Sequence, residues 1–314
     1  MHVLAAARGR WTCLTASALA RARPLGIIAI VCATWEIGCD EIRAQGVIQT
    51  IVDDVHNGTG GGATEESPRP ADQASKGRPA SASSDDSDSM PFEFVIVAGY
   101  SAFYAATSPF WLPIAALEDD GGPAYFPRFP YDHVAGHLAE GATAAPGRLW
   151  SGRFSAEYLE PFTDVNGVGG RLLVSTTSRF GLDAEASHFE ERRPHGGFDT
   201  LWIGDANLVF RFAQAEKAEF RAGLGFNWLD HPHDALRDAD FGFNFTYGAD
   251  FFPRKPWVLS ADLDAGTLGR TGLVRFRTTG GIMLRSLECY TGYEYLDVGR
   301  THFNLLLAGV RLWF

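Results

Sequence analysis

The sequence has no uninterrupted apolar run as long as the roughly 18 residues that a helix needs to cross a lipid bilayer. Its longest apolar run reads PLGIIAIVCATW, residues 24–35, and follows Arg8, Arg10, Arg21 and Arg23. Positive charge before a short apolar core is typical of an export signal. We therefore expect residues 1–44 to form a signal peptide that is cleaved after Ala44.

Lysine and cysteine are also scarce. Lysine occurs only at positions 76, 217 and 255, and the formal net charge is -11. Nucleic-acid binding needs clustered positive charge, so this composition argues against a nucleic-acid partner. Of the four cysteines, cleavage after Ala44 leaves Cys289 alone, which excludes an internal disulfide. Cys39 ends EIGC, which resembles a lipoprotein processing site, but Glu36 stands where such sites have an apolar residue.

Apolar side chains are sparse again over residues 53–90, which read DDVHNGTGGGATEESPRPADQASKGRPASASSDDSDSM. Such a composition cannot offset the entropy lost on ordering, so we expect a disordered linker over residues 45–90. Residues 91–148 combine an apolar stretch with several prolines. They predict an unassigned periplasmic segment, which forms either a plug or extra strands.

From residue 149 the sequence alternates apolar and polar residues in ten stretches, approximately 149–159, 168–180, 182–190, 200–212, 218–229, 241–252, 257–266, 272–284, 287–296 and 302–314. In WIGDANLVFRF, residues 202–212, apolar side chains fall on one face, while Asp205, Asn207 and Arg211 fall on the other. A soluble sandwich also alternates, but these stretches are longer than its usual strands. The pattern predicts an all-β fold: an antiparallel transmembrane β-barrel over residues 149–314, of about ten strands, with eight or twelve as alternatives.

The connections and the aromatic residues agree with this topology. If the C-terminal end faces the periplasm, the longer connections around 160–167, 191–199 and 230–240 face outward. The tight turns at Gly181, PRKP and LRS then face inward. On the same scheme Trp202 and Trp228 lie at the outer ends of strands, and Trp150 and Trp257 at the inner ends. Long outer loops and two aromatic girdles are typical of outer-membrane barrels.

These features resemble those of Gram-negative outer-membrane β-barrel proteins, without indicating a particular family. The likeness covers residues 149–314 and includes Phe314, with Leu312 and Val310 on the same face. In that superfamily a last strand with a closing aromatic residue resembles the signal that the barrel assembly machinery reads. The resemblance implies an outer-membrane location, with outer-membrane lipid and the assembly machinery as partners.

The polar faces of the strands predict a charged lumen in which acidic and basic side chains nearly balance. The inward set comprises Arg153, Glu157, Arg171, Arg179, Asp183, Glu185, Asp205, Arg211, Glu219, Arg221, Asp250, Asp262, Asp264, Arg275, Arg277, Glu288, Glu294 and Arg311. A turn at TLGR, residues 267–270, would place Asp262 opposite Arg275 and Ser260 opposite Arg277. A turn at 284–287 would place Arg277 opposite Glu294. A narrow barrel must pair such charges, whereas a wide pore leaves them in water.

Three functions are compatible with this sequence. The first is porin-like passive transport of small solutes, and the alternative is a non-conducting structural or surface-presenting barrel. An outer-membrane lipid hydrolase comes third, because His302 and Asp297 have no serine near them and the neighbours Ser187 and His188 point to opposite faces. His231 and His233 lie in an outer loop, where a pair of histidines is more often solvated than bound to a metal. We expect no cofactor, no metal site and no catalytic residue.

Overall fold

A computed structural model describes residues 46–58, 92–139, 147–161, 165–193, 197–232 and 239–314. The expected signal peptide, residues 1–44, and most of the expected linker lie outside these ranges. Among the described helices, none is long and apolar enough to cross a membrane.

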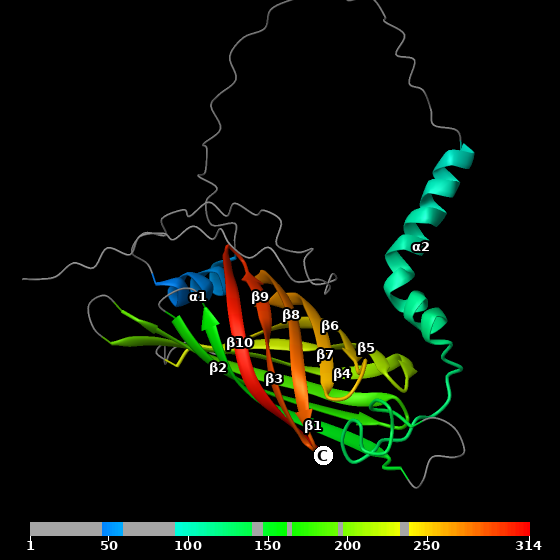
Figure 1. The fold of residues 1–314 in the computed structure, drawn as a ribbon. Helices are drawn as coiled ribbons and strands as arrows, with labels where there is room; N and C mark the ends of the chain where they lie inside the picture. Colours follow the sequence, from blue (N-terminus) through cyan, green and yellow to red (C-terminus); the bar gives the residue numbers. More distant parts are fainter. Residues whose placement is uncertain (1–45, 59–91, 140–146, 162–164, 194–196, 233–238) are drawn as a thin grey trace, which may run out of the picture. The chain divides into compact units, whose positions relative to one another are not determined.

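Ten antiparallel strands form one closed barrel, in which β1 pairs with β10 although the two lie far apart in the sequence (Figure 1). The expected barrel of ten strands is confirmed. The strands are β1 (Trp150–Pro161), β2 (Val165–Thr176), β3 (Phe180–Arg192), β4 (Phe198–Ala215), β5 (Ala218–Asp230), β6 (Asp240–Phe251), β7 (Trp257–Leu268), β8 (Thr271–Leu284), β9 (Leu287–Val298) and β10 (Thr301–Trp313).

The alternation of the sequence becomes an alternation between the exterior and the lumen. Along β4, Leu208 and Phe210 are exposed on the exterior, while Asn207 and Arg211 are buried in the lumen. Closing the sheet satisfies the edge hydrogen bonds, as a strand-built membrane protein requires. The barrel therefore presents an apolar exterior, and its charged side chains are buried inside the lumen.

We call the end formed by the connections after β1, β3, β5, β7 and β9 the outer end, and the opposite end the inner end. The longest connection, residues 231–239, lies at the outer end. The expected inner turn at Gly181 is wrong: Gly181 pairs with Ser175 inside the β2–β3 ladder. The turn is formed instead by residues 177–179, where Arg179 has a φ of 71°.

The expected register between β7 and β8 is also wrong. Leu268 pairs with Thr271, so the turn is the two residues Gly269 and Arg270, and Gly269 supplies a φ of 55°. This tighter turn places Asp262 opposite Arg277 and Asp264 opposite Arg275. The shift is two residues, so every side chain keeps its face. The expected pairing of Arg277 with Glu294 is confirmed.

The expected disorder from residue 45 does not hold for the helix α1 (Val47–Asn57). Ile48, Ile51, Val52 and Val55 recur with helical spacing, and all four are fully or almost fully buried. Tertiary packing of this apolar face stabilises a helix that would be marginal alone. We call α1 the cap helix, because its contacts lie at the outer end of the barrel.

Residues 91–148 contain no strand of the barrel within their described part. They include α2 (Phe92–Leu117), in which Pro109 and Pro113 leave the carbonyls of Ala105 and Pro109 without helical donors. The hydroxyl of Ser108 donates to the Ala105 carbonyl, at 2.7 Å, and the phenol of Tyr247 donates to that of Pro109, at 2.8 Å. The helix tolerates both prolines because these hydroxyls satisfy its backbone.

The segment after α2, residues 118–139, lies in the inner end of the barrel, and we call it the inner plug. Its Tyr131 packs with Phe252 and Trp313 of the barrel. Gly136 lies so close to the β4–β5 turn that an added Cβ would be 1.9 Å from the Glu216 carbonyl oxygen. The described residues of this region thus add no strand to the barrel, and the inner plug packs against its inner end.

Candidate functional site

The structure buries all ten carboxylates and eight guanidinium groups that the sequence places in the lumen. Each is at most 8% exposed, and together we call them the charge network. The charge network includes all of the expected lumen-lining residues Arg153, Arg171, Asp205, Arg211, Arg221, Asp262, Arg275, Arg277, Glu288 and Glu294. Buried charges of this density require partners, so their contacts decide what the lumen can do.

Two ion pairs of the charge network cross the whole diameter of the lumen. Arg153 on β1 donates to Asp250 on β6, at 2.8 Å, and these strands stand opposite each other in the ring of ten. Arg171 on β2 contacts Asp262 on β7, at 2.9 Å, and these strands are opposite as well. Facing walls are therefore within the reach of one salt bridge.

A third bridge joins β3 to β8, which are also opposite strands. Arg275 and Arg277 on β8 both donate to Glu185 on β3, at 2.9 and 2.8 Å. The lumen is thus bridged by three sets of ion pairs, whose side chains hold their partners in fixed geometry. Cross-strand register could not reveal these contacts, because it relates neighbouring strands only.

Glu157, Glu185 and Glu294 bring carboxylate oxygens within 4.8 Å of one another, a spacing that suits a metal ion. The guanidinium of Arg277 contacts all three of these carboxylates. Its positive charge neutralises the cluster where a cation would otherwise bind. The cluster is therefore part of the charge network.

The outer half of the lumen is apolar, in contrast to the charged lumen that the polar faces of the strands predict. Its lining includes Leu159, Val165, Phe189, Leu201, Ile203, Leu229, Leu268, Leu273, Leu296, Val298, Phe303, Leu305 and Leu307, all buried. The apolar face of the cap helix packs against these residues. The sequence does contain an indication of this apolar lining: in LLL, residues 305–307, both faces of the strand are apolar.

Polar contacts hold both ends of the cap helix. Glu191 accepts hydrogen bonds from the backbone N–H groups of Val47 and Ile48, at 3.0 and 2.9 Å. These bonds satisfy two of the N–H groups that lack a partner within the helix at its N-terminus. Asp54 accepts from the Arg300 backbone N–H at 3.0 Å and from its guanidinium at 2.9 Å. Burial raises the pKa of Asp54, but the bonds from Arg300 outweigh it and lower that pKa below its ordinary value.

Similar contacts hold the inner plug. Asp119 accepts two hydrogen bonds from Arg179, each at 2.7 Å, and one from the backbone N–H of Gln214. Burial raises the pKa of Asp119, yet Arg179 and the backbone donors lower it overall below the ordinary value. Burial, with the nearby charge of Glu288, raises the pKa of Tyr131 to about 12. Both ends of the lumen are therefore covered by specific, charge-assisted contacts.

One serine contact at the inner end has the order of a catalytic triad. Nε2 of His137 lies 3.3 Å from the Ser151 hydroxyl, and Nδ1 lies 3.6 Å from the Glu219 carboxylate. His137 also packs against Phe252 and Trp313. Because Ser151 is 6% exposed, a substrate carbonyl cannot approach its hydroxyl in this structure. We interpret the arrangement as an anchor of the inner plug.

The other candidates from the sequence do not assemble into a catalytic site. His302 is directly opposite Asp297 across the β9–β10 ladder. Ser187 is buried in the lumen, while His188 packs on Trp202 with ring centroids 4.6 Å apart. His231 contacts the backbone carbonyl of Thr200 at 2.7 Å, and His233 lies outside the described residues.

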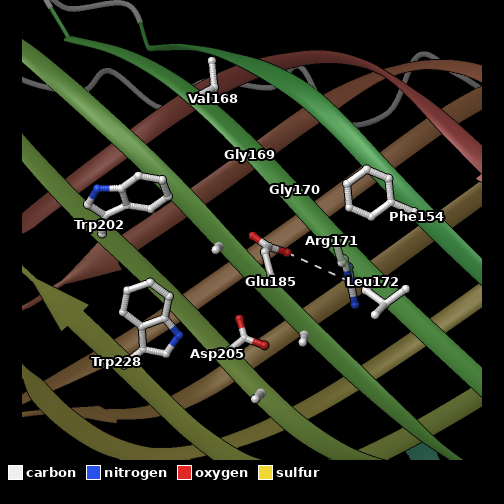
Figure 2. A pocket seen from close by; sticks show the side chains of 13 residues that line it. Phe154, Val168, Gly169, Gly170, Arg171, Leu172, Glu185, Trp202, Asp205 and Trp228 are labelled. Atoms are coloured by element: carbon white, nitrogen blue, oxygen red, sulfur yellow. Dashed lines mark ion pairs between the residues drawn. The ribbon is translucent and has the colours of Figure 1, made fainter.

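A groove of about 570 Å³ lies on the barrel wall over β1 to β5. Figure 2 shows Phe154 on one side and Trp202 and Trp228 on the other, with Arg171 and Glu185 joined by an ion pair between them. Those charged side chains are buried in the charge network. The wall surface that the groove offers is thus mostly apolar and suits lipid hydrocarbon.

The expected assembly-signal residues lie on the exterior of β10 and next to it. Val310 and Leu312 are 45% and 46% exposed. Phe314 exchanges two backbone hydrogen bonds with Gly152 of β1, at 2.8 and 2.9 Å, and its ring packs on Trp150. These contacts extend the seam at which the barrel closes.

No family model matches this sequence, and no curated protein matches it. Solved barrels resemble parts of the structure at low identity. The Yersinia pestis outer membrane protein Ail is 13% identical, with a TM-score of 0.31 over 52% of this chain and 99% of that one. The N-terminal β-barrel domain of Pseudomonas aeruginosa OprF is 13% identical, with a TM-score of 0.25 over 52% and 97%. The KdgM porin is 14% identical, with a TM-score of 0.26 over 52% and 99%. The fold rests on the strand pairing itself.

Proposed function

We propose that this protein is an outer-membrane barrel with a closed lumen, which acts as a structural or surface-presenting scaffold and does not conduct solutes. Its location is supported by the closed ring of ten strands and the apolar exterior. A sheet with this exterior needs lipid around it, since exposed apolar surface of this extent is unfavourable in water.

The observation that carries the proposal is the set of three ion-pair bridges across the lumen diameter. A conducting path would have to part these buried pairs, and removing one partner of such a pair costs about 3–5 kcal/mol. The cap helix and the inner plug cover the two ends in addition. Closure is therefore built in at three successive levels.

Porin-like passive transport ranks second, because it requires a water-filled path beside the charge network. Lipid hydrolysis ranks third, and the arrangement of Ser151 with His137 is what favours it. A liposome swelling assay separates the first two functions. We expect proteoliposomes to swell no faster in small sugars than protein-free liposomes, and sugar-dependent swelling would establish the porin function instead.

Location is tested separately by membrane fractionation with a heat-modifiability gel. We expect the protein in the outer-membrane fraction, with a mobility that shifts only after heating. A protein that is recovered in the soluble periplasm, without a shift, contradicts the membrane location.

A further inference from the structure

The outer half of the lumen is a blind cup with an apolar wall. Leu201, Leu229 and Leu305, from three different strands, are each at most 2% exposed within it. Its floor is polar: the phenol of Tyr290 donates to Glu157 at 2.7 Å, and Glu157 also pairs with Arg277. A scaffold needs no such cup, because the charge network already closes the lumen below it.

The cap helix fills this cup as a ligand would. Ile48, Ile51, Val52 and Val55 enter the apolar cluster and are at most 2% exposed. Together they contribute about as much hydrocarbon as a saturated chain of roughly 14 carbons. Removal of the cap helix would leave an apolar chamber that can bind a chain of that size.

The rim of the cup holds a carboxylate receptor. The backbone N–H of Arg300 and its guanidinium converge on the carboxylate of Asp54, which is 1% exposed. A Cβ added to Gly299 would lie 2.9 Å from a carboxylate oxygen of Asp54, so glycine leaves room for this group. Planar, charge-assisted donors of this kind recognise carboxylates in general.

The cap helix therefore presents a carboxylate above an apolar face, which is the chemistry of a fatty acid. We propose that the outer half of the lumen binds an amphiphile with a carboxylate head and a hydrocarbon tail, and that the cap helix is its built-in competitor. The head binds at Arg300 and the tail fills the apolar cup. This inference goes beyond the scaffold function, because it assigns a ligand class to one end of the lumen.

A tethered competitor acts at a high effective concentration, so weakening it must strengthen ligand binding. Asp54→Asn removes the competing carboxylate but leaves Arg300 free for the ligand. Arg300→Gln removes the guanidinium that would bind either carboxylate, that of Asp54 or that of the ligand. The two variants thus change ligand binding in opposite directions. A purely structural role of the Asp54–Arg300 ion pair does not predict this difference.

The experiment uses a diazirine analogue of myristate with the full chain in nanodiscs, and photo-crosslinks are mapped by mass spectrometry. Crosslinks to lumen residues such as Leu201 and Leu305 report the cup, and those to Leu208 and Leu306 report surrounding lipid. We expect lumen crosslinks to rise about fivefold or more in Asp54→Asn, and to fall again in Asp54→Asn/Arg300→Gln. Asp53→Asn removes the same charge from the same helix and should match the wild type.

Crosslinks confined to the lipid-facing residues in every variant would overturn the proposal. Equal lumen labelling by a diazirine tetradecane, which lacks the carboxylate, would overturn the assignment of the head group. If Asp54→Asn loses its heat-modifiable fold, amide exchange of residues 47–57 in the wild type decides instead. Faster exchange as myristate is added supports the site, and unchanged exchange at saturation refutes it.

Discussion

At the scale of single residues, the lumen is organised by contacts that cross it and only partly by contacts between neighbouring strands. Asp262 shows this most clearly. Arg277 is directly opposite it on β8, yet the carboxylate of Asp262 contacts Arg171 on β2, across the lumen, at 2.9 and 3.1 Å, and Arg221 on β5. The register between neighbouring strands therefore does not set which arginines this carboxylate contacts.

We predict that Asp262 couples more strongly to Arg171 than to Arg277. Two double-mutant cycles with alanine, followed by urea unfolding in detergent micelles, give both coupling free energies. We expect each single substitution to cost up to about 3–5 kcal/mol, because it removes one partner from a buried charge, and the Asp262–Arg171 coupling to exceed about 1 kcal/mol. A larger coupling of Asp262 with Arg277 would show that pairing between neighbouring strands, and not contact across the lumen, determines its energetics.

The inward parity of the charged residues was predictable from the sequence, since alternation alone assigns a side chain to a face. The β7–β8 register was predicted two residues out of place, because Thr267 and Leu268 read equally well as turn or strand. The bridges from β1 to β6, β2 to β7 and β3 to β8 were not predictable. They depend on strand number and closure, which no local pattern encodes.

Ser151 supplies a second prediction at this scale. Its hydroxyl is buried beneath the inner plug, so we expect a fluorophosphonate probe to leave the folded protein unlabelled. The readout is intact mass, with Ser151→Ala as the control. Labelling that disappears in Ser151→Ala would mean that the hydroxyl is both accessible and activated, and would favour the hydrolase function.

At the scale of elements, the cap helix and the inner plug, which precede the barrel in the sequence, cover the two ends of the lumen that the strands enclose. The residues of the cap helix fall within the expected linker, although Ile48, Ile51, Val52 and Val55 have helical spacing. A run of 11 residues is too short to be a stable helix on its own, and only the apolar cup stabilises it. The fold of the inner plug was not predictable from the sequence, because its residues follow neither the strand period nor the helix period.

Docking of the cap helix should weaken in acid. The pKa of Asp54 is lower in the folded protein than its ordinary value, so its stabilising contribution is complete above that ordinary value and is lost as the pH falls toward the folded one. We expect protection of the amides of residues 47–57 to decrease over that range, after correction for intrinsic exchange. The ionisable side chains of Glu191, and of His56 with Asp240, also lie at this interface. The slope is therefore compared with that of Asp54→Asn, and equal slopes would contradict the assignment.

The strand β10 carries a prediction about assembly. We expect Phe314→Asp to lower the yield of heat-modifiable barrel in cells, because it removes the proposed recognition residue and the ring that packs on Trp150. Leu284→Asp places the same charge on the exterior at the same end of β8, and should reduce the yield less. An equal loss in both variants would show that the effect is only the cost of a charge at the membrane surface.

At the scale of the whole molecule, the structure consists of a lipid-facing wall around a filled interior. The wall was predictable, because ten alternating stretches define it. The filling arises from an apolar outer layer, a charged middle and a packed inner end, contributed by segments from residue 47 to residue 314. Such a molecule has three independent barriers to solutes, so the loss of one should not open it.

Single-channel recording in planar lipid bilayers tests this closure most directly. The refolded full chain and a variant that lacks residues 47–57 are compared at the same applied voltages, with insertion verified by heat-modifiability of the same preparation. We predict no discrete conductance steps from either protein, because the three diametric bridges and the inner plug remain in both. Repeatable channel steps from the wild-type protein would show that the lumen is open and wet, and would contradict the closed barrel.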